Sequence, residues 1–173
     1  DENAILFTSG DNDTWPTLYL QIAEGYRTDV TILNVHLLNT DWFLSSFSRR
    51  EPGFPLKPGQ YNGGGFRVRQ WSDSVVAVAS DNVPERYYFG VDSLPGDTLY
   101  INVPPTLDAK YILAQDQVIL EIIKNNKWVR PIYFTQPYTW LRPHLRIEGI
   151  VHQLVPYQNA VTNRELAARN LLE

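Results

Sequence analysis

Two short polar clusters each follow an apolar run of the chain, one after residues 4–9 and one at the end of residues 29–38. Carboxylate and amide oxygens bind hard cations such as Mg²⁺ and Ca²⁺, and they also hydrogen-bond sugar hydroxyls. The same residue types form Asx turns and complement the positive N-terminus of a helix. Two roles therefore stay open: a ligand site, with a divalent cation as one ligand, or capping alone. The candidate residues are Asp11, Asn12, Asp13, Asn39 and Asp41.

The segment between the clusters predicts how they are placed. The run at 4–9 ends in small residues, as a buried parallel strand does, and the run at 29–38 is rich in β-branched residues. A helix over 16–24, with Thr14 as N-cap and Pro16 in its first turn, joins them. So short a connection predicts a βαβ unit with neighbouring parallel strands. The apolar residues at helical spacing are Leu18, Tyr19, Ile22 and Ala23.

This arrangement predicts where the polar clusters meet. The carboxyl ends of parallel neighbours lie at one edge of a sheet, and ligands bind there in open α/β folds. We therefore expect Asp11 or Asp13 to line a polar concavity with Asn39 or Asp41. The other acid of the first pair is expected to cap the helix. Phosphate is disfavoured, because the acids would repel it and no Lys or Arg stands nearby in the sequence.

The rest of the chain predicts further strands and helices. Thr40 or Asp41 is expected to cap a short helix that turns Trp42, Phe43 and Phe47 inward. The clearest helix spans 112–128, with an apolar stripe facing the sheet, and single strands are predicted within 130–137 and 146–156. The apolar stripe consists of Val118, Ile119, Ile122 and Ile123. We expect Trp128, Ile132 and Phe134 to be buried, and Lys124, Asn125 and Lys127 to be exposed.

These elements predict the fold class: α/β, a three-layer Rossmann-like arrangement with a mostly parallel or mixed sheet and helices on both faces. Residues 1–173 are expected to form one domain, with a Pro- and Gly-rich loop at 51–66 and a β-rich insertion at 67–103. A terminal helix is predicted at 163–173. The chain does not begin with Met, which favours a piece cut from a longer protein.

Other chemical motifs are weak. The stretch NGGG at 62–65 lacks the GK[ST] ending of a phosphate loop, and the three histidines have no metal-ligand spacing. No G-x-S-x-G elbow, HExxH or kinase signature is present. The stretch 138–146 places Arg142 and Arg146 among aromatic residues. It predicts either a carbohydrate or anion surface, or a surface on which another domain docks.

Composition narrows the protein class. Apolar residues at 43% with 13% aromatic exclude a disordered chain. Fifteen basic against nineteen acidic side chains, a net charge of -4, argue against a nucleic-acid partner. The absence of cysteine excludes disulfides and thiolate metal sites.

Several stretches resemble one known family in the same order. They include ENAILFTSGDNDTWPTLYLQIAEGYRTDVTILNVHLLNTDWF, FPLKPGQY, ILAQDQVILEIIKNNKWVRPIYFTQP and RIEGIVHQLVP, and residues 67–103 match least. The chain resembles the soluble C-terminal region of a bacterial family of multi-spanning membrane proteins of unknown function. That family is related to protein O-mannosyltransferase-type glycosyltransferases. The most specific segments are GDNDT, LLNTDW and WVRPIYF.

The resemblance implies a domain on the periplasmic side of the inner membrane, attached to its own membrane-embedded N-terminal part. In such sugar transferases the catalytic acids lie in a loop between early transmembrane helices, which this chain lacks. No catalytic residue is therefore carried over to it.

Two functions remain in view. One is a non-catalytic accessory domain that binds an acceptor protein or glycan, or stabilises the membrane part. The alternative is an independent enzyme, a metal-assisted hydrolase or transferase on sugars, with its site at the acidic rim around Asp11 and Asp13.

Overall fold

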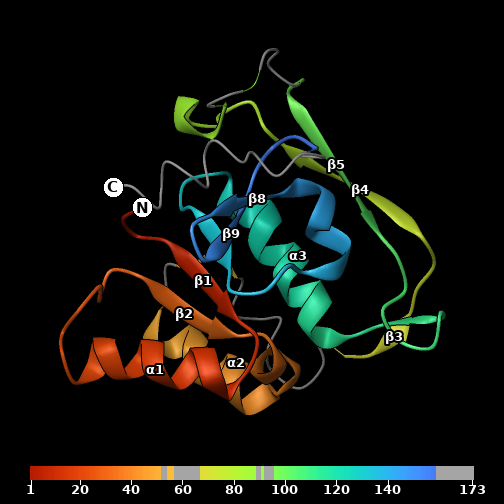
Figure 1. The fold of residues 1–173 in the computed structure, drawn as a ribbon. Coiled ribbons are helices and arrows are strands. Elements are labelled where there is room, and N and C mark those ends of the chain that lie inside the picture. Colours follow the sequence, from red (N-terminus) through yellow and green to blue (C-terminus); the bar gives the residue numbers. More distant parts are fainter. Residues whose placement is uncertain (52–53, 57–66, 89–90, 92–95, 159–173) are drawn as a thin grey trace.

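A five-stranded mixed sheet lies at the centre of the structure (Figure 1). In spatial order its strands are β2 (Thr31–Asn34), β1 (Ile5–Thr8), β7 (Ile132–Phe134), β9 (Val151–Leu154) and β8 (Leu145–Glu148). The first three strands run parallel, and β9 runs antiparallel to both β7 and β8. The structure is a computed structural model that describes residues 1–51, 54–56, 67–88, 91 and 96–158.

The predicted βαβ unit is confirmed. Strands β1 and β2 are parallel neighbours, with Ile5 opposite Thr31 and Thr8 opposite Asn34. The chain between them forms α1 (Asp11–Ile22), which lies below β1 and β2 in Figure 1. After α1 the chain turns at Gly25, whose positive φ of 65° suits a residue without Cβ.

The start of α1 differs from the prediction. The helix begins three residues before Thr14, with Gly10 as N-cap, so Pro16 lies in the second turn and not in the first. The Thr14 side chain is buried and contacts the sheet: its Oγ1 lies 2.7 Å from Oγ1 of Thr8 and accepts a hydrogen bond from Asn34 Nδ2 at 2.9 Å. Thr14 therefore joins the helix to both parallel strands and does not cap it.

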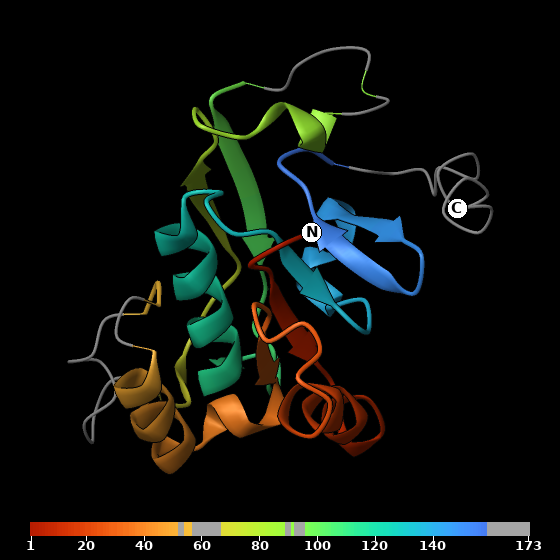
Figure 2. The same cartoon turned by 90° about the vertical axis from the view of Figure 1, so that its left-hand side faces the viewer.

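The long helix α3 (Ala114–Asn126) supplies one side of the core. Its predicted apolar stripe is buried, and it lies beside the sheet in Figure 2. Trp128, Ile132 and Phe134 are buried as expected. Lys124 and Lys127 are exposed, whereas Asn125 is half-buried, and its Nδ2 donates to Glu121 Oε1 at 2.9 Å.

The single strand predicted within 146–156 is two strands in the structure. The segment 146–156 folds back on itself as the hairpin of β8 and β9, in which Glu148 pairs with Val151. The two-residue turn begins with Gly149 at a φ of 64°. A positive φ at this position is typical of hairpin turns, and glycine adopts it without steric cost.

The described residues between 67 and 112 include two small ribbons outside the central sheet. Figure 1 shows the longer one running past α3, and the short strands β3 and β6 pair below it. The ribbons consist of β4 (Ser74–Ala79) with β5 (Thr98–Val103), and β3 (Arg69–Gln70) with β6 (Tyr111–Ile112). The remaining helices are η1 (His36–Asn39), α2 (Asp41–Arg50), η3 (Glu85–Tyr88) and η4 (Thr139–His144).

Helices α1 and α2 bury less of their apolar surface than the sequence predicts. Phe47 of α2 is buried, but Trp42 is 64% exposed, so the prediction that it turns inward is wrong. On α1, Leu18 is half-buried while Tyr19 and Ile22 are exposed. Both helices lie at the β2 edge of the sheet, where only part of a helix surface finds core to pack against (Figure 2).

The α/β class and the mixed sheet are thus confirmed, while the three-layer Rossmann-like order is not. The parallel part is limited to three strands, and an antiparallel hairpin completes the sheet. The predicted terminal helix at 163–173, the stretch 62–65 and most of the loop at 51–66 lie outside the described residues.

Candidate functional site

Asp13 is the helix-capping residue of the acidic cluster. Its carboxylate accepts hydrogen bonds from the backbone N–H groups of Ser9, at 2.8 Å, and Gly10, at 2.9 Å. The Thr135 hydroxyl at the end of β7 donates to the same carboxylate. Burial raises the pKa of Asp13, but the hydrogen bonds from Ser9, Thr135 and Gly10 outweigh it and hold the pKa below its ordinary value. The carboxylate of Asp13 is therefore occupied by hydrogen bonds to the start of the helix and to the end of β7.

Replacing Asp13 by Asn should lower the free energy of unfolding at neutral pH by about 1–2 kcal/mol, the range for lost N-terminal caps. The native pKa lies below the unfolded one, so this stability is fully present above the unfolded pKa and is lost as pH falls through the native pKa. Urea unfolding of wild type and Asp13→Asn at pH 7 and pH 3 checks this, because the gap between them should narrow at pH 3. The exposed neighbour Asp11→Asn is the control. A gap of equal size at both pH values would contradict a role for the carboxylate charge.

Asn39 serves a different helix. Its side-chain oxygen accepts the Gln115 N–H at 2.9 Å, and its Nδ2 donates to Gln115 Oε1 at 2.7 Å. This pair satisfies a free N–H in the first turn of α3 and ties η1 to that helix. Asn39 is therefore a helix-capping residue and does not lie free at a ligand site.

The other three candidates stand in solvent. Asp11 and Asn12 are exposed in the first turn of α1, and Asp41 is exposed in the first turn of α2. Among the described residues no three His, Cys, Asp or Glu side chains are grouped so that they could hold a metal ion. Binding of a cation or another ligand by Asp11, Asn12 or Asp41 stays a prediction.

Only part of the arginine-aromatic stretch at 138–146 lies on the surface of the protein. Arg146 is 6% exposed and forms an ion pair of 2.6 Å with Glu148 and a hydrogen bond of 2.6 Å with Gln153 Oε1. Trp140 is buried as well, while Arg142 is exposed. The two surface roles predicted for this stretch are therefore wrong for its buried half, because the β8–β9 hairpin supplies Arg146 with partners.

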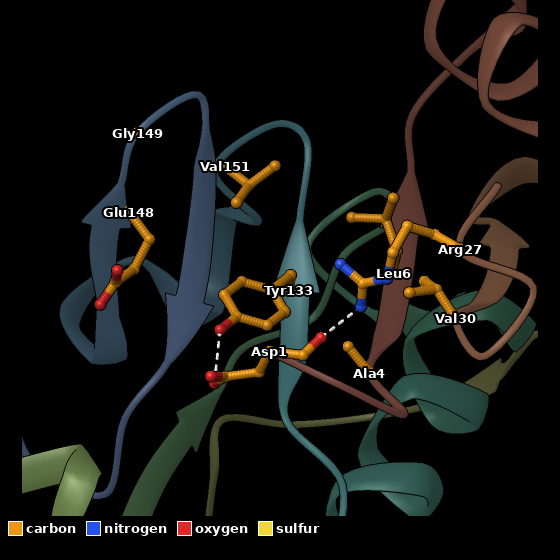
Figure 3. Close-up of a pocket in the computed structure, with 9 residues that line it drawn as sticks. All are labelled: Asp1, Ala4, Leu6, Arg27, Val30, Tyr133, Glu148, Gly149 and Val151. Atoms are coloured by element: carbon orange, nitrogen blue, oxygen red, sulfur yellow. Dashed lines mark hydrogen bonds between the residues drawn. The ribbon is translucent and has the colours of Figure 1, made fainter. Parts of the chain in front are cut away.

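One pocket of about 440 Å³ lies over the face of the sheet formed by Leu6 and Tyr133 (Figure 3). Its polar groups are largely paired with one another: the Tyr133 hydroxyl donates to the Asp1 carboxylate at 2.8 Å, and Arg27 donates to the Asp1 carbonyl at 2.5 Å. Burial, followed by the charge of Glu148, raises the pKa of Tyr133 to about 12. The phenol therefore stays protonated as a donor, and this pocket offers few free groups for catalysis.

A second cavity, of about 470 Å³, is a groove between α1, β2 and α2. We call it the tryptophan groove. Its apolar lining comes from the sheet edge and from both helices, and polar residues of the same elements complete the lining. The lining residues that matter below are Trp15, Leu18, Ile32, Trp42, Phe43 and Arg50.

The two tryptophans of the groove follow the predicted polar clusters closely in the sequence. Trp15 follows Asp13 by two positions, and Trp42 follows Asp41 by one. None of Asp11, Asp13, Asn39 and Asp41 lines this groove, so it is not the polar concavity that the sequence predicts. The sequence signal for this groove was a tryptophan near the start of each helix. It was missed because the helical periodicity assigned Trp42 to the core.

The family of the chain follows from a sequence comparison. The model of the family described as TMEM260-associated domain 2 matches residues 1–63 and 68–170, most of the chain. The chain belongs to this family. It is thus a domain of a TMEM260-like membrane protein, which agrees with the membrane-protein association that the resemblance implies.

Searches with this chain found no match among curated proteins and none among solved structures. Within the described ranges, no helix is long and apolar enough to cross a membrane. The match includes the βαβ unit, α3 and the hairpin, so the family relationship covers the elements that form both cavities.

Proposed function

We propose that this chain is a non-catalytic, extracytoplasmic accessory domain of a bacterial membrane protein related to protein O-mannosyltransferase-type glycosyltransferases. In this role it docks on the membrane-embedded part of its own protein and stabilises it. Membership of the TMEM260-associated family supports the membrane-protein setting. The paired polar groups at Asp13, Asn39 and Tyr133 support a role other than catalysis.

The observation that carries the docking role is an apolar patch on the second half of α1 and the following turn. We call it the α1 patch. Ile22 is 82% exposed, Tyr26 and Tyr19 are 62% and 61% exposed, and Leu20 is 43% exposed. Tyr19 and Ile22 are three positions apart on α1 and therefore lie on the same side of the helix, and large exposed apolar side chains that lie together are typical of contact sites. The α1 patch consists of Tyr19, Leu20, Ile22 and Tyr26.

Ile22→Asp in the full-length protein should lower its melting temperature by at least about 4 °C, since an interface anchor is worth 2 kcal/mol or more. The reason is that docking would bury the introduced carboxylate. The same substitution in the isolated chain should change the free energy of unfolding by less than about 0.5 kcal/mol, because the side chain is exposed there. Melting curves of both forms in detergent and buffer provide the measurement.

The matched control is Val75→Asp, which places the same charge at a side chain that is 68% exposed on β4. It should leave both forms unchanged. A full-length protein that tolerates Ile22→Asp as well as Val75→Asp does not dock through the α1 patch.

The alternative of an independent enzyme at the acidic rim is not favoured by any observation. Its central acid, Asp13, already accepts three hydrogen bonds from the protein, and Asn39 is bound to Gln115. Only exposed side chains of the cluster remain free to meet a substrate, and those residues occupy the first turns of two helices.

A further inference from the structure

The tryptophan groove differs from the α1 patch in having a floor and two walls. Trp15 and Leu18 come from α1, Ile32 comes from the edge strand β2, and Trp42 and Phe43 come from α2. Its volume of about 470 Å³ lies within the range of small-molecule sites. None of the residues of the α1 patch lines it, so the two surfaces can be tested separately.

The two tryptophans of the groove differ from the other three of the chain. Trp71, Trp128 and Trp140 each donate their indole N–H to a protein oxygen, at 2.9, 2.8 and 2.9 Å. Within the described residues the indole N–H groups of Trp15 and Trp42 have no such acceptor, and these side chains are 57% and 64% exposed. Two large aromatic faces with free donors therefore stand at the walls of a single groove.

The charged side chains of the groove largely balance one another, which disfavours a strongly ionic ligand. Asp29 in its lining is held by Arg27 through two hydrogen bonds of 2.8 and 2.9 Å, and these lower the pKa of Asp29 far below its ordinary value. The remaining charged side chains, Arg50 and Glu51, have opposite signs. A ligand that meets this lining gains from hydrogen bonds and apolar contact but not from net charge.

The edge of β2 offers little to an extended peptide. Strand addition needs a run of free backbone groups, but β2 has four residues. Gln21 Nε2 already donates to the Val30 carbonyl at 2.7 Å, just before the strand. At the other end the Asn34 side chain accepts from the His36 N–H at 2.9 Å and turns the chain away into η1. Only the middle of the edge is left for pairing.

We propose that the tryptophan groove binds a neutral oligosaccharide, with sugar rings stacked on Trp15 and Trp42. The faces of an indole are electron-rich, so they attract the partly positive C–H groups on the apolar face of a pyranose. The indole N–H groups and the amide, hydroxyl and charged groups of the groove lining then meet the sugar hydroxyls. This inference extends the accessory role proposed above but does not depend on docking through the α1 patch.

The test uses neutral di- to tetrasaccharides of glucose, galactose and mannose, titrated into the ¹⁵N-labelled chain. The five indole N–H signals provide an internal control. At least one sugar series should shift the signals of Trp15 and Trp42 in a saturable manner and leave those of Trp71, Trp128 and Trp140 in place. Trp15→Ala and Trp42→Ala should each weaken the binding at least tenfold. Trp42→Phe should retain more affinity than Trp42→Ala, because a stacking face remains.

Tyr100→Ala is the matched control, since this aromatic side chain is 61% exposed on β5 and lies outside the groove. Its affinity should equal that of wild type. Saccharides that shift no indole signal, or that bind equally to Trp15→Ala and wild type, would overturn the proposal. Preference for a sulfated sugar over its neutral parent would also overturn it. So would a Val- and Thr-rich hexapeptide that binds in the groove where no sugar does.

Discussion

Replacing Phe134 by alanine should lower the free energy of unfolding by about 3–5 kcal/mol, the range for removing a buried aromatic side chain. Phe134 is 1% exposed on β7, the central strand of the sheet, between β1 and β9. Its ring stacks on Phe7 of β1 with centroids 4.8 Å apart, and it lies 5.7 Å from the ring of Tyr138. The cavity left by alanine would open between two strands and η4, where the sheet backbone cannot collapse to fill it.

Urea denaturation of wild type and Phe134→Ala measures this loss. Val129→Ala is the control, because this side chain is 74% exposed just before β7, and its change should stay within about 0.5 kcal/mol. A loss below about 1 kcal/mol for Phe134→Ala would show that β7 does not lie in the core.

The second large effect is expected at Asp116, a carboxylate that is 2% exposed in the first turn of α3. It accepts hydrogen bonds from Thr106 Oγ1 at 2.6 Å, from the Tyr138 hydroxyl at 2.5 Å and from Trp140 Nε1 at 2.9 Å. Burial, and then the charge of Asp116, raise the pKa of Tyr138 well above its ordinary value, so the phenol remains a donor at all ordinary pH values.

Asp116→Ala should therefore lower the free energy of unfolding by roughly 3–4 kcal/mol, because it leaves three donors without an acceptor in a buried site. Tyr138→Phe removes a single donor of the network and should cost less. Calorimetric melting of both variants beside Asp73→Ala, an exposed acid, gives the comparison. Equal melting temperatures for Asp116→Ala and Asp73→Ala would show that the hydrogen-bond network of Asp116 does not stabilise the fold.

Most of the central sheet could be predicted from local patterns. The runs at β1 and β2 are apolar, the connection between them has the length of a helical crossover, which is typical of a parallel pair, and the structure pairs them in that way. The stripe of α3 and the burial of Trp128 and Phe134 follow from the 3.6-residue and two-residue periods of helix and strand. In these elements one face is buried along the whole length, so the spacing of the apolar residues is enough to predict which side chains are buried.

The candidate site could be predicted only in part. That one acid of the first cluster caps the helix follows from residue types alone, and Asp13 takes this role. The sequence could not show that Asn39 would be bound by Gln115, because that contact joins residues 76 positions apart. It also could not show that Arg146 would be buried, since its partner Glu148 is brought to it by a hairpin that the apolar pattern merged into one strand.

The sequence by itself determined the α/β class, the parallel pair β1–β2, the buried stripe of α3 and the capping acid at the start of α1. The tertiary structure decided which apolar residues of α1 and α2 reach solvent. Ile22 and Trp42 stand at the helical spacing that predicts buried residues, yet they are 82% and 64% exposed. The physical reason is that a helix at the edge of a sheet has core on only part of its circumference, and periodicity does not reveal where the sheet ends. Where the sheet ends at β2, the tryptophan groove and the α1 patch appear.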